Sequence, residues 1–252
     1  MVAPTMRAER QNASFADKPG ALGELALTLP IFLVYQLGVV FLDARNATDI
    51  VTARLLELSH GDRPTYLGLT AATGVILSAV FGVLGRGQTL RFAKIVQIAA
   101  EGAAYAIAMG VGTSWLVGKM FAGARTSADG PFAGLVMSLG AGFYEELAFR
   151  AILFGVGAKL LVWLFAHERV RLVGTSLPLG GRGLLTIVGW ALLCSCAFSA
   201  MHYMGPLGDP FDLRSFAVRA VLGLALTVVY ATRGFAAAVW THALYDVWVL
   251  VL

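Results

Sequence analysis

The chain has 252 residues, of which 58% are hydrophobic and only 13% are charged. A soluble domain carries about 25% charged residues, so this composition excludes an ordinary soluble globular protein and indicates a chain surrounded mainly by lipid. The net charge of +4 comes from basic residues in short stretches between apolar runs, a distribution typical of membrane-protein loops rather than of a nucleic-acid-binding protein.

The apolar runs predict an all-α membrane bundle of about seven transmembrane helices. Residues 1–20 form a polar tail, and the run that follows has no small-residue cleavage site, so we expect an uncleaved first helix. The predicted spans, bounded by charge clusters, are Ala21–Leu42, Thr65–Leu84, Ile95–Val117, Phe132–Phe165, Leu184–Met204, Leu213–Thr232 and Phe235–Leu252. We expect residues 21–252 to form a single membrane domain. Its N-terminus is predicted to be cytoplasmic, because the inner segments then carry more Lys and Arg than the outer ones.

Two stretches depart from this simple pattern. The connection Asp43–Pro64 contains apolar residues at a spacing that predicts an amphipathic helix in the membrane interface. The run Phe132–Phe165 would be about 50 Å long as an α-helix, whereas the hydrocarbon core is ~30 Å thick. It must therefore either protrude from the bilayer or break into two pieces.

This long run carries charged residues near its middle, in the segment Phe143-Tyr144-Glu145-Glu146-Leu147-Ala148-Phe149-Arg150. A charged group at the bilayer centre costs at least about 2.5 kcal/mol, so each one needs a partner or a water-filled cavity. On an α-helix Glu146 and Arg150 can form an ion pair, whereas Glu145 points roughly 140° away from Arg150. Burial without a counter-ion favours the protonated form of Glu145 and suits it to act as a general base near neutral pH. The alternative is a charge cluster at a helix end, which the apolar flanks disfavour.

Two further pairs lie four residues apart within predicted spans. Phe198 and His202 share one helix face, and so do His242 and Asp246, where the aspartate can orient or charge-balance the imidazole. Either pair alone is compatible with simple packing. If both converge with Glu145, they bring a carboxylate and two imidazoles into one cavity, as hydrolytic chemistry requires.

Taken in order, Glu145-Glu146-x-x-x-Arg150, Phe198-x-x-x-His202 and His242-x-x-x-Asp246 resemble the EExxxR, FxxxH and HxxxN/D motifs of the CPBP family. This family of glutamic-type intramembrane endopeptidases includes the type II CAAX prenyl endopeptidases and many bacterial Abi-type proteins. The resemblance covers residues 132–252, and the first three predicted helices match only in character. It implies an enzyme that hydrolyses a peptide bond near the membrane-anchored or C-terminal end of a substrate protein, with no cofactor beyond water.

The resemblance also implies roles for individual residues. Glu145 and His202 would activate a water molecule, while His242 and Asp246 would stabilise the oxyanion. Structural support of the site would come from Glu146, Arg150 and Phe198. Prenyl-protein members of the family have asparagine at the position of Asp246, and an ionised aspartate would repel an oxyanion. We therefore expect Asp246 to act through His242, by fixing its tautomer and favouring the imidazolium.

Other functions are compatible with these residues. Glu145, His202, His242 and Asp246 could together ligate zinc, although no HExxH motif is present. Catalysis by a cysteine is disfavoured, because Cys194 and Cys196 lie eight and six residues before His202, too far along one helix for contact. A non-catalytic immunity or scaffold protein, or a proton-coupled transporter, could use the same buried residues. No two-half repeat supports transport.

The expected partners are membrane lipid and a membrane-anchored or lipidated protein or peptide. Prenylated CAAX tails are the least favoured of these substrates. The sequence is rich in Ala, Gly, Leu and Val, and with the resemblance to bacterial members this favours a multi-pass protein of the bacterial inner (cytoplasmic) membrane.

Overall fold

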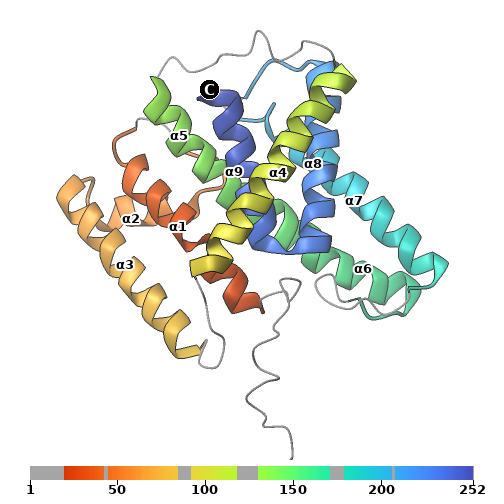
Figure 1. The fold of residues 1–252 in the computed structure, drawn as a ribbon, viewed down its shortest axis with the longest axis horizontal. Coiled ribbons are helices and arrows are strands. Elements are labelled where there is room, and N and C mark those ends of the chain that lie inside the picture. The colour runs from red at the N-terminus through yellow and green to blue at the C-terminus, as the bar shows by residue number, and fades with distance from the viewer. Residues whose placement is uncertain are drawn as a thin grey trace, which may run out of the picture.

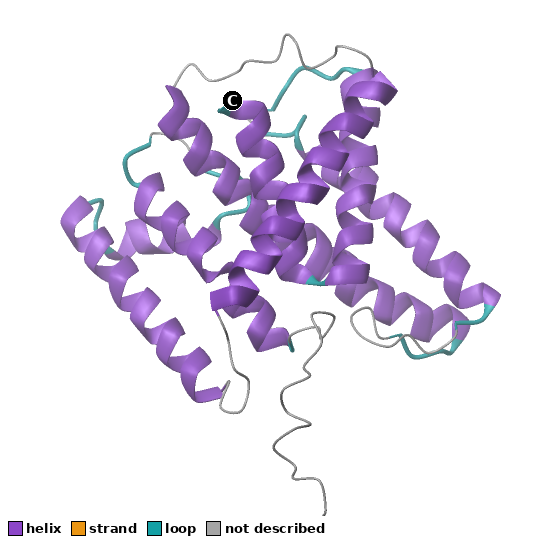
Figure 2. Cartoon of the chain, in the orientation of Figure 1, coloured by secondary structure: helices purple, strands orange, loops and turns teal. Residues whose placement is uncertain are grey.

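The computed structural model describes residues 20–42, 45–84, 92–117, 130–170, 179–205 and 208–251, and every regular element within these ranges is a helix (Figures 1 and 2). The elements are α1 (Ala21–Val39), α2 (Ile50–Leu58), α3 (Arg63–Leu84), α4 (Phe92–Val117), α5 (Gly130–Gly140), η3 (Ala141–Val156), α6 (Gly157–Ala166), α7 (Gly181–Met201), α8 (Leu213–Arg233) and α9 (Phe235–Leu250). The all-α architecture is confirmed. The predicted polar tail, apart from Gly20, lies outside the described residues.

The described helices include six that are long and apolar enough to cross a membrane. These are α1, α3, α4, α7, α8 and the continuous helix formed by α5, η3 and α6. The apolar helix α9 is shorter, with 16 residues. All seven predicted spans are thus present as helices, and α2 occupies the connection in which an amphipathic helix was expected. The end of the fifth span was placed wrongly: α7 stops at Met201, and His202 is its C-cap rather than an internal residue.

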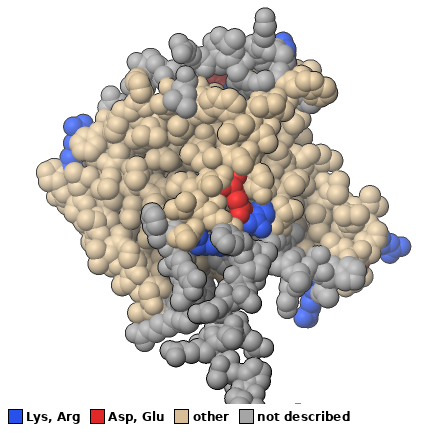
Figure 3. All heavy atoms as spheres, in the orientation of Figure 1, with Lys and Arg blue, Asp and Glu red and all other residues tan. Residues whose placement is uncertain are grey.

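The outer surface of the bundle is apolar. Large hydrophobic side chains project outward from several helices, including Val75 of α3, Trp163 of α6 and Leu185 of α7, which is 74% exposed. The face in Figure 3 consists mostly of uncharged atoms, and Lys and Arg lie at its edges and in one patch beside acidic atoms near its middle. Contiguous apolar surface of this kind marks contact with lipid or with other proteins, and the helix lengths select lipid. The chain is therefore an integral, multi-pass membrane protein.

One unbroken helix runs obliquely through the molecule from Gly130 to Ala166 (Figure 1). Its middle section, η3, is a π-helix, in which backbone hydrogen bonds close over five residues instead of four. The flanking residues Gly140 and Gly157 keep right-handed helical backbone angles, so the chain passes through both junctions without a break. The possibility that this span divides into two pieces is thus wrong. The wider turns of η3 also replace the α-helical spacing on which the expected side-chain angles rested.

Helix α9 occupies the centre of the bundle and packs against α1, α4, α5, α8 and η3 (Figure 1). Its first turns are built from small residues, and Ala236, Ala237 and Ala238 are almost completely buried. A Cβ atom at Gly142 of η3 would lie 2.9 Å from the Cα atom of Ala243. Glycine is required at this position because the backbones of η3 and α9 touch there. This contact brings the charged segment of η3 level with His242.

A buried carboxylate of α1 fixes the start of α9. Glu24 is 5% exposed, and its Oε2 accepts a hydrogen bond of 2.6 Å from the backbone N–H of Ala236. An acidic group at this position satisfies an otherwise unpaired N–H and interacts favourably with the helix dipole. Gly234 allows the approach, because its φ of +102° and its closeness to Glu24 leave no room for a side chain. The N-terminal helix thereby sets the position of the helix that carries His242 and Asp246.

Candidate active site

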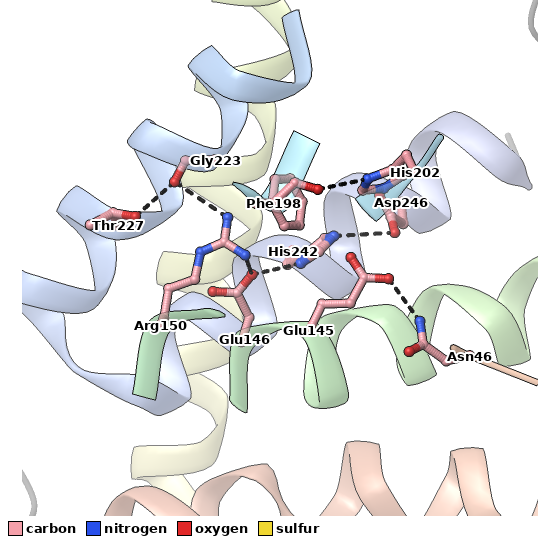
Figure 4. A network of polar contacts seen from close by, with 10 residues as sticks. All are labelled: Asn46, Glu145, Glu146, Arg150, Phe198, His202, Gly223, Thr227, His242 and Asp246. Atoms are coloured by element: carbon pink, nitrogen blue, oxygen red, sulfur yellow. Dashed lines mark hydrogen bonds and ion pairs between the residues drawn. The ribbon is translucent and has the colours of Figure 1, made fainter. Parts of the chain in front are cut away.

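The residues singled out in the sequence converge in the interior of the bundle (Figure 4). A cavity of about 700 Å³ opens between η3, α4, α7, α8 and α9. Its wall includes Glu145 from η3, Phe198 and His202 from α7, and His242 and Asp246 from α9. Glu146 and Arg150 lie beside the cavity but do not line it, and they are 0% and 1% exposed. The two adjacent glutamates therefore occupy different environments.

Glu146 is the centre of a closed charge cluster. Its Oε1 lies 2.9 Å from Nη1 of Arg150 and 2.7 Å from Nδ1 of His242. The guanidinium also donates from Nη2 to the carbonyl oxygen of Gly223 in α8, at 3.3 Å. The expected ion pair between Glu146 and Arg150 is thus present. Its extension to His242 was not expected, and it couples a residue assigned to structural support directly to a proposed catalytic one.

Phe198 is surrounded by the charged residues of the site. The guanidinium carbon of Arg150 lies 4.1 Å from the centre of the Phe198 ring, a cation–π contact in a dry environment. The rings of His202 and His242 approach edge-on, with centroid distances of 5.1 and 5.9 Å. The side chain predicted as packing support for His202 therefore contacts three charged or ionisable groups at once.

Glu145 points away from Arg150 and into the cavity (Figure 4). Its Oε1 accepts a hydrogen bond of 2.7 Å from Nδ2 of Asn46, which lies in the connection between α1 and α2. Its Oε2 is buried and has no hydrogen-bond partner among the described residues. One carboxylate oxygen is thus held in place while the other can bind a water or a substrate group.

The hydrogen bond of His202 determines which of its nitrogens can accept a proton. Nδ1 lies 3.0 Å from the carbonyl oxygen of Phe198, and a carbonyl can only accept, so Nδ1 carries the hydrogen. In the neutral imidazole this leaves Nε2 with a free lone pair. The tautomer is therefore the one that a general base at the cavity wall requires.

His242 has a carboxylate beside each ring nitrogen. Glu146 lies 2.7 Å from Nδ1, and Oδ2 of Asp246 lies 3.4 Å from Nε2. The two negatively charged carboxylates, one beside each ring nitrogen, favour the doubly protonated imidazolium. This agrees with the orienting function expected of Asp246. The contact with Asp246 is longer than an ordinary N–H···O hydrogen bond, so the hydrogen on Nε2 is held loosely.

Other candidate groups have different surroundings. Ser199 donates to the carbonyl oxygen of Phe216 in α8 at 2.7 Å, rather than to His202 or to its own helix. Cys194 is buried in a cluster with Phe154 and Ala158, while Cys196 is exposed, and neither lines the cavity. Within the described part of the chain, no three His, Cys, Asp or Glu side chains are grouped closely enough to hold a metal ion.

Sequence reasoning missed Asn46 entirely. The residue belongs to no motif and lies in a short connection 99 positions before Glu145, so only its polarity within a mostly apolar protein set it apart. The contact between Glu146 and His242 was also missed, because it joins two helices whose relative rotation no spacing rule predicts.

The fold and the site together define a polytopic membrane protein with carboxylate and imidazole groups gathered around an internal cavity. Residues 127–248, nearly half of the chain, match the family model of Type II CAAX prenyl endopeptidase Rce1-like proteins. This match confirms the resemblance found in the motifs and indicates a protease. No curated protein and no solved structure matches the chain.

Proposed function

We propose that the protein is a glutamic-type intramembrane endopeptidase that hydrolyses a peptide bond near the membrane-anchored or C-terminal end of a substrate protein. The proposal depends on one observation: Glu145, His202, His242 and Asp246 line a single cavity, while Glu146 and Arg150 are sealed beside it. Amide hydrolysis needs a base, an oxyanion stabiliser and access for water and substrate, and the cavity combines groups suited to each of these tasks.

In the proposed reaction Glu145 and His202 activate a water molecule. The unpartnered Oε2 of Glu145 and the Nε2 lone pair of His202 are the two acceptors available for its protons. The water oxygen forms a bond to the carbonyl carbon of the substrate. When the C–N bond breaks, the leaving nitrogen takes up a proton from the same pair of residues. No group other than water is consumed.

The attack leaves a negative charge on the carbonyl oxygen, and this oxyanion needs a hydrogen-bond donor beside it. The Nε2–H group of His242 is the candidate, because its 3.4 Å contact with Asp246 is weak enough to be exchanged for a negatively charged oxygen. Glu146 holds the opposite nitrogen and keeps the ring cationic. Asp246 then contributes charge balance rather than a direct hydrogen bond to the oxyanion.

The surroundings of the cavity favour a substrate with an apolar anchor. A second hollow of about 350 Å³ lies between α4 and α8, and its lining is almost entirely apolar. Met109, Val218 and Leu222 line both spaces, so the two are neighbours. A substrate segment bound there would stay in contact with lipid while its polar end reached the cavity.

We propose the bacterial cytoplasmic membrane as the location of the protein.

The test compares membrane proteomes of three strains: one lacking the protein, one carrying Glu145→Gln and one carrying the matched control Glu57→Gln. Glu57 is an exposed residue of α2 paired with Arg54, so its substitution leaves the cavity untouched. We expect an uncleaved precursor to accumulate in the first two strains and not in the control. That precursor would identify the substrate and its cleavage site.

A different pattern would contradict the proposal. If the precursor accumulates only when the whole protein is missing, while Glu145→Gln processes it normally, the protein acts as a binder or scaffold. Expression of each variant should be checked in the same membranes, so that a missing protein is not mistaken for an inactive one.

A further inference from the structure

The connection between α1 and α2 brings a polar side chain from outside the family-matched region into the catalytic cavity. Asn46 is 8% exposed and lines the cavity, and its Nδ2 lies 2.7 Å from Oε1 of Glu145 (Figure 4). The matched region begins at residue 127, so this contact comes from the half of the chain that carries none of the motifs. Among the residues that the structure describes, Asn46 is the one whose side chain hydrogen-bonds the carboxylate of Glu145.

The orientation of the Asn46 amide is fixed by Thr48. The Oδ1 atom of Asn46 accepts one hydrogen bond from the backbone N–H of Thr48, at 2.9 Å, and another from its hydroxyl, at 2.6 Å. A backbone N–H can only donate, so the atom facing it must be the amide oxygen. The amide NH₂ group is therefore forced to face Glu145.

The backbone of this connection is also anchored. The N–H of Asn46 donates to the hydroxyl of Tyr35 at 3.2 Å, and that hydroxyl donates to Oδ2 of Asp49 at 2.7 Å. Asp49 in turn caps α2 by accepting from the N–H of Thr52 at 2.9 Å. Tyr35 is completely buried against the ring of Tyr144, the residue directly before Glu145. Tyr35 thus anchors the backbone of Asn46 and packs against the neighbour of Glu145, which fixes the amide and the carboxylate relative to each other.

We propose that Asn46 is a positioning residue for Glu145, an inference that rests on the proposed function. Its amide holds Oε1, stabilises the ionised carboxylate and leaves Oε2 free to take a proton from the attacking water. A hydrogen bond to the charged form of an acid favours that form. The connection between α1 and α2 consequently belongs to the active site, and α1 and α2 do more than complete the bundle.

The first test follows the protonation of Glu145 without using a substrate. Dicyclohexylcarbodiimide reacts with protonated buried carboxyl groups, and labelling of Glu145 in the full-length detergent-solubilised protein can be measured by mass spectrometry across pH. In the Asn46→Ala and Asn46→Asp proteins, we expect Glu145 to remain labelled up to a pH about one unit higher than in the wild type. Glu145→Gln provides the unlabelled reference.

Thr48 supplies the matched pair of variants. Thr48→Val removes one of the two hydrogen bonds to the amide oxygen, and it should shift the labelling in the same direction as the Asn46 variants but by less, because the backbone N–H of Thr48 remains. Thr48→Ser keeps the hydroxyl and should label like the wild type. The charged and titratable residues that share the cavity with Glu145 are unchanged in the Asn46 and Thr48 variants: His202, Asp212, Arg214, Arg219, His242, Tyr245 and Asp246. A shift shared by Asn46→Ala and Thr48→Val therefore reports the amide contact, whereas Asn46→Asp also adds a carboxyl group beside Glu145.

The second measurement is the rate of cleavage of the precursor identified by proteomics, across pH. Asn46→Ala should lower kcat about tenfold with little change in KM, and the acidic limb of the profile should move to higher pH. Wild-type labelling and wild-type pH profiles in both Asn46 variants would overturn the inference, and so would a lower rate with neither shift. Failure of the proposed function has a different signature, namely equal cleavage by the wild type and Glu145→Gln.

Discussion

Glu145 and Glu146 are adjacent in the chain, but they lie in two neighbouring regions of the interior with different surroundings. The closed cluster of Glu146, Arg150 and Nδ1 of His242 excludes solvent and places opposite charges in contact, although Oε2 of Glu146 has no hydrogen-bond partner among the described residues. The cavity region of Glu145, Asn46 and His202 keeps a carboxylate oxygen and a ring nitrogen available. The comparison teaches that the acid proposed as catalytic is the less deeply buried of the two. Full burial with a counter-ion stabilises a carboxylate, whereas partial burial beside a cavity leaves it able to accept a proton.

The largest expected effect comes from breaking the closed cluster. Arg150→Met keeps most of the side-chain volume but leaves the buried Glu146 without the guanidinium and with His242 as its remaining charged partner, which should reduce the free energy of unfolding by about 3–5 kcal/mol. Thermal or denaturant-induced unfolding in detergent would measure this loss. Glu145→Gln should change the same quantity by no more than about 0.5 kcal/mol, because it removes no paired charge.

The double variant Glu146→Gln/Arg150→Met sharpens that prediction. Removing both charges avoids the uncompensated carboxylate, so this protein should be more stable than Arg150→Met alone. If the two variants are equally unstable, the cost comes from lost packing of Arg150 against Phe198 rather than from the buried charge.

A smaller effect, confined to activity, is expected on the cavity side. His202→Gln keeps a polar side chain but cannot act as a base, so kcat should fall about 100-fold while the unfolding temperature stays near that of the wild type. Ser199→Ala is the neighbouring control: it removes a hydrogen bond to Phe216 without altering the cavity wall, and should retain nearly full activity. If His202→Gln lowers the unfolding temperature as well as kcat, His202 supports the structure of the site rather than acting as a base.

Asp246 joins the two regions through His242, and its replacement should have the mildest effect. Asp246→Asn removes a negative charge next to Nε2 and makes the imidazolium easier to deprotonate. The basic limb of the pH–rate profile should therefore move to lower pH, while the maximal rate changes by about tenfold or less. An unchanged basic limb would show that Asp246 does not act through the charge of His242.

Much of this molecule follows from local patterns in the sequence. The apolar runs predicted helices at all seven expected spans and at α2, because lipid imposes length and hydropathy on each segment separately. Helical spacing likewise predicted the pairing of Glu146 with Arg150 and the contact between His242 and Asp246. The motifs, read in order, predicted the family. The roles assigned to Glu145, His202, His242 and Asp246 stay predictions.

The remaining features were decided only by tertiary structure. The π-helical turns of η3, the bond from Glu146 to His242 and the contribution of Asn46 all depend on how helices distant in the sequence rotate and approach one another. Spacing rules describe residues on one helix, and they carry no information on the angle between two helices. The sequence by itself therefore determined which residues are neighbours along a helix and which of the two adjacent glutamates lacks a cation on its own helix. Packing between elements decided which distant side chains, Asn46 and His242, contact each glutamate.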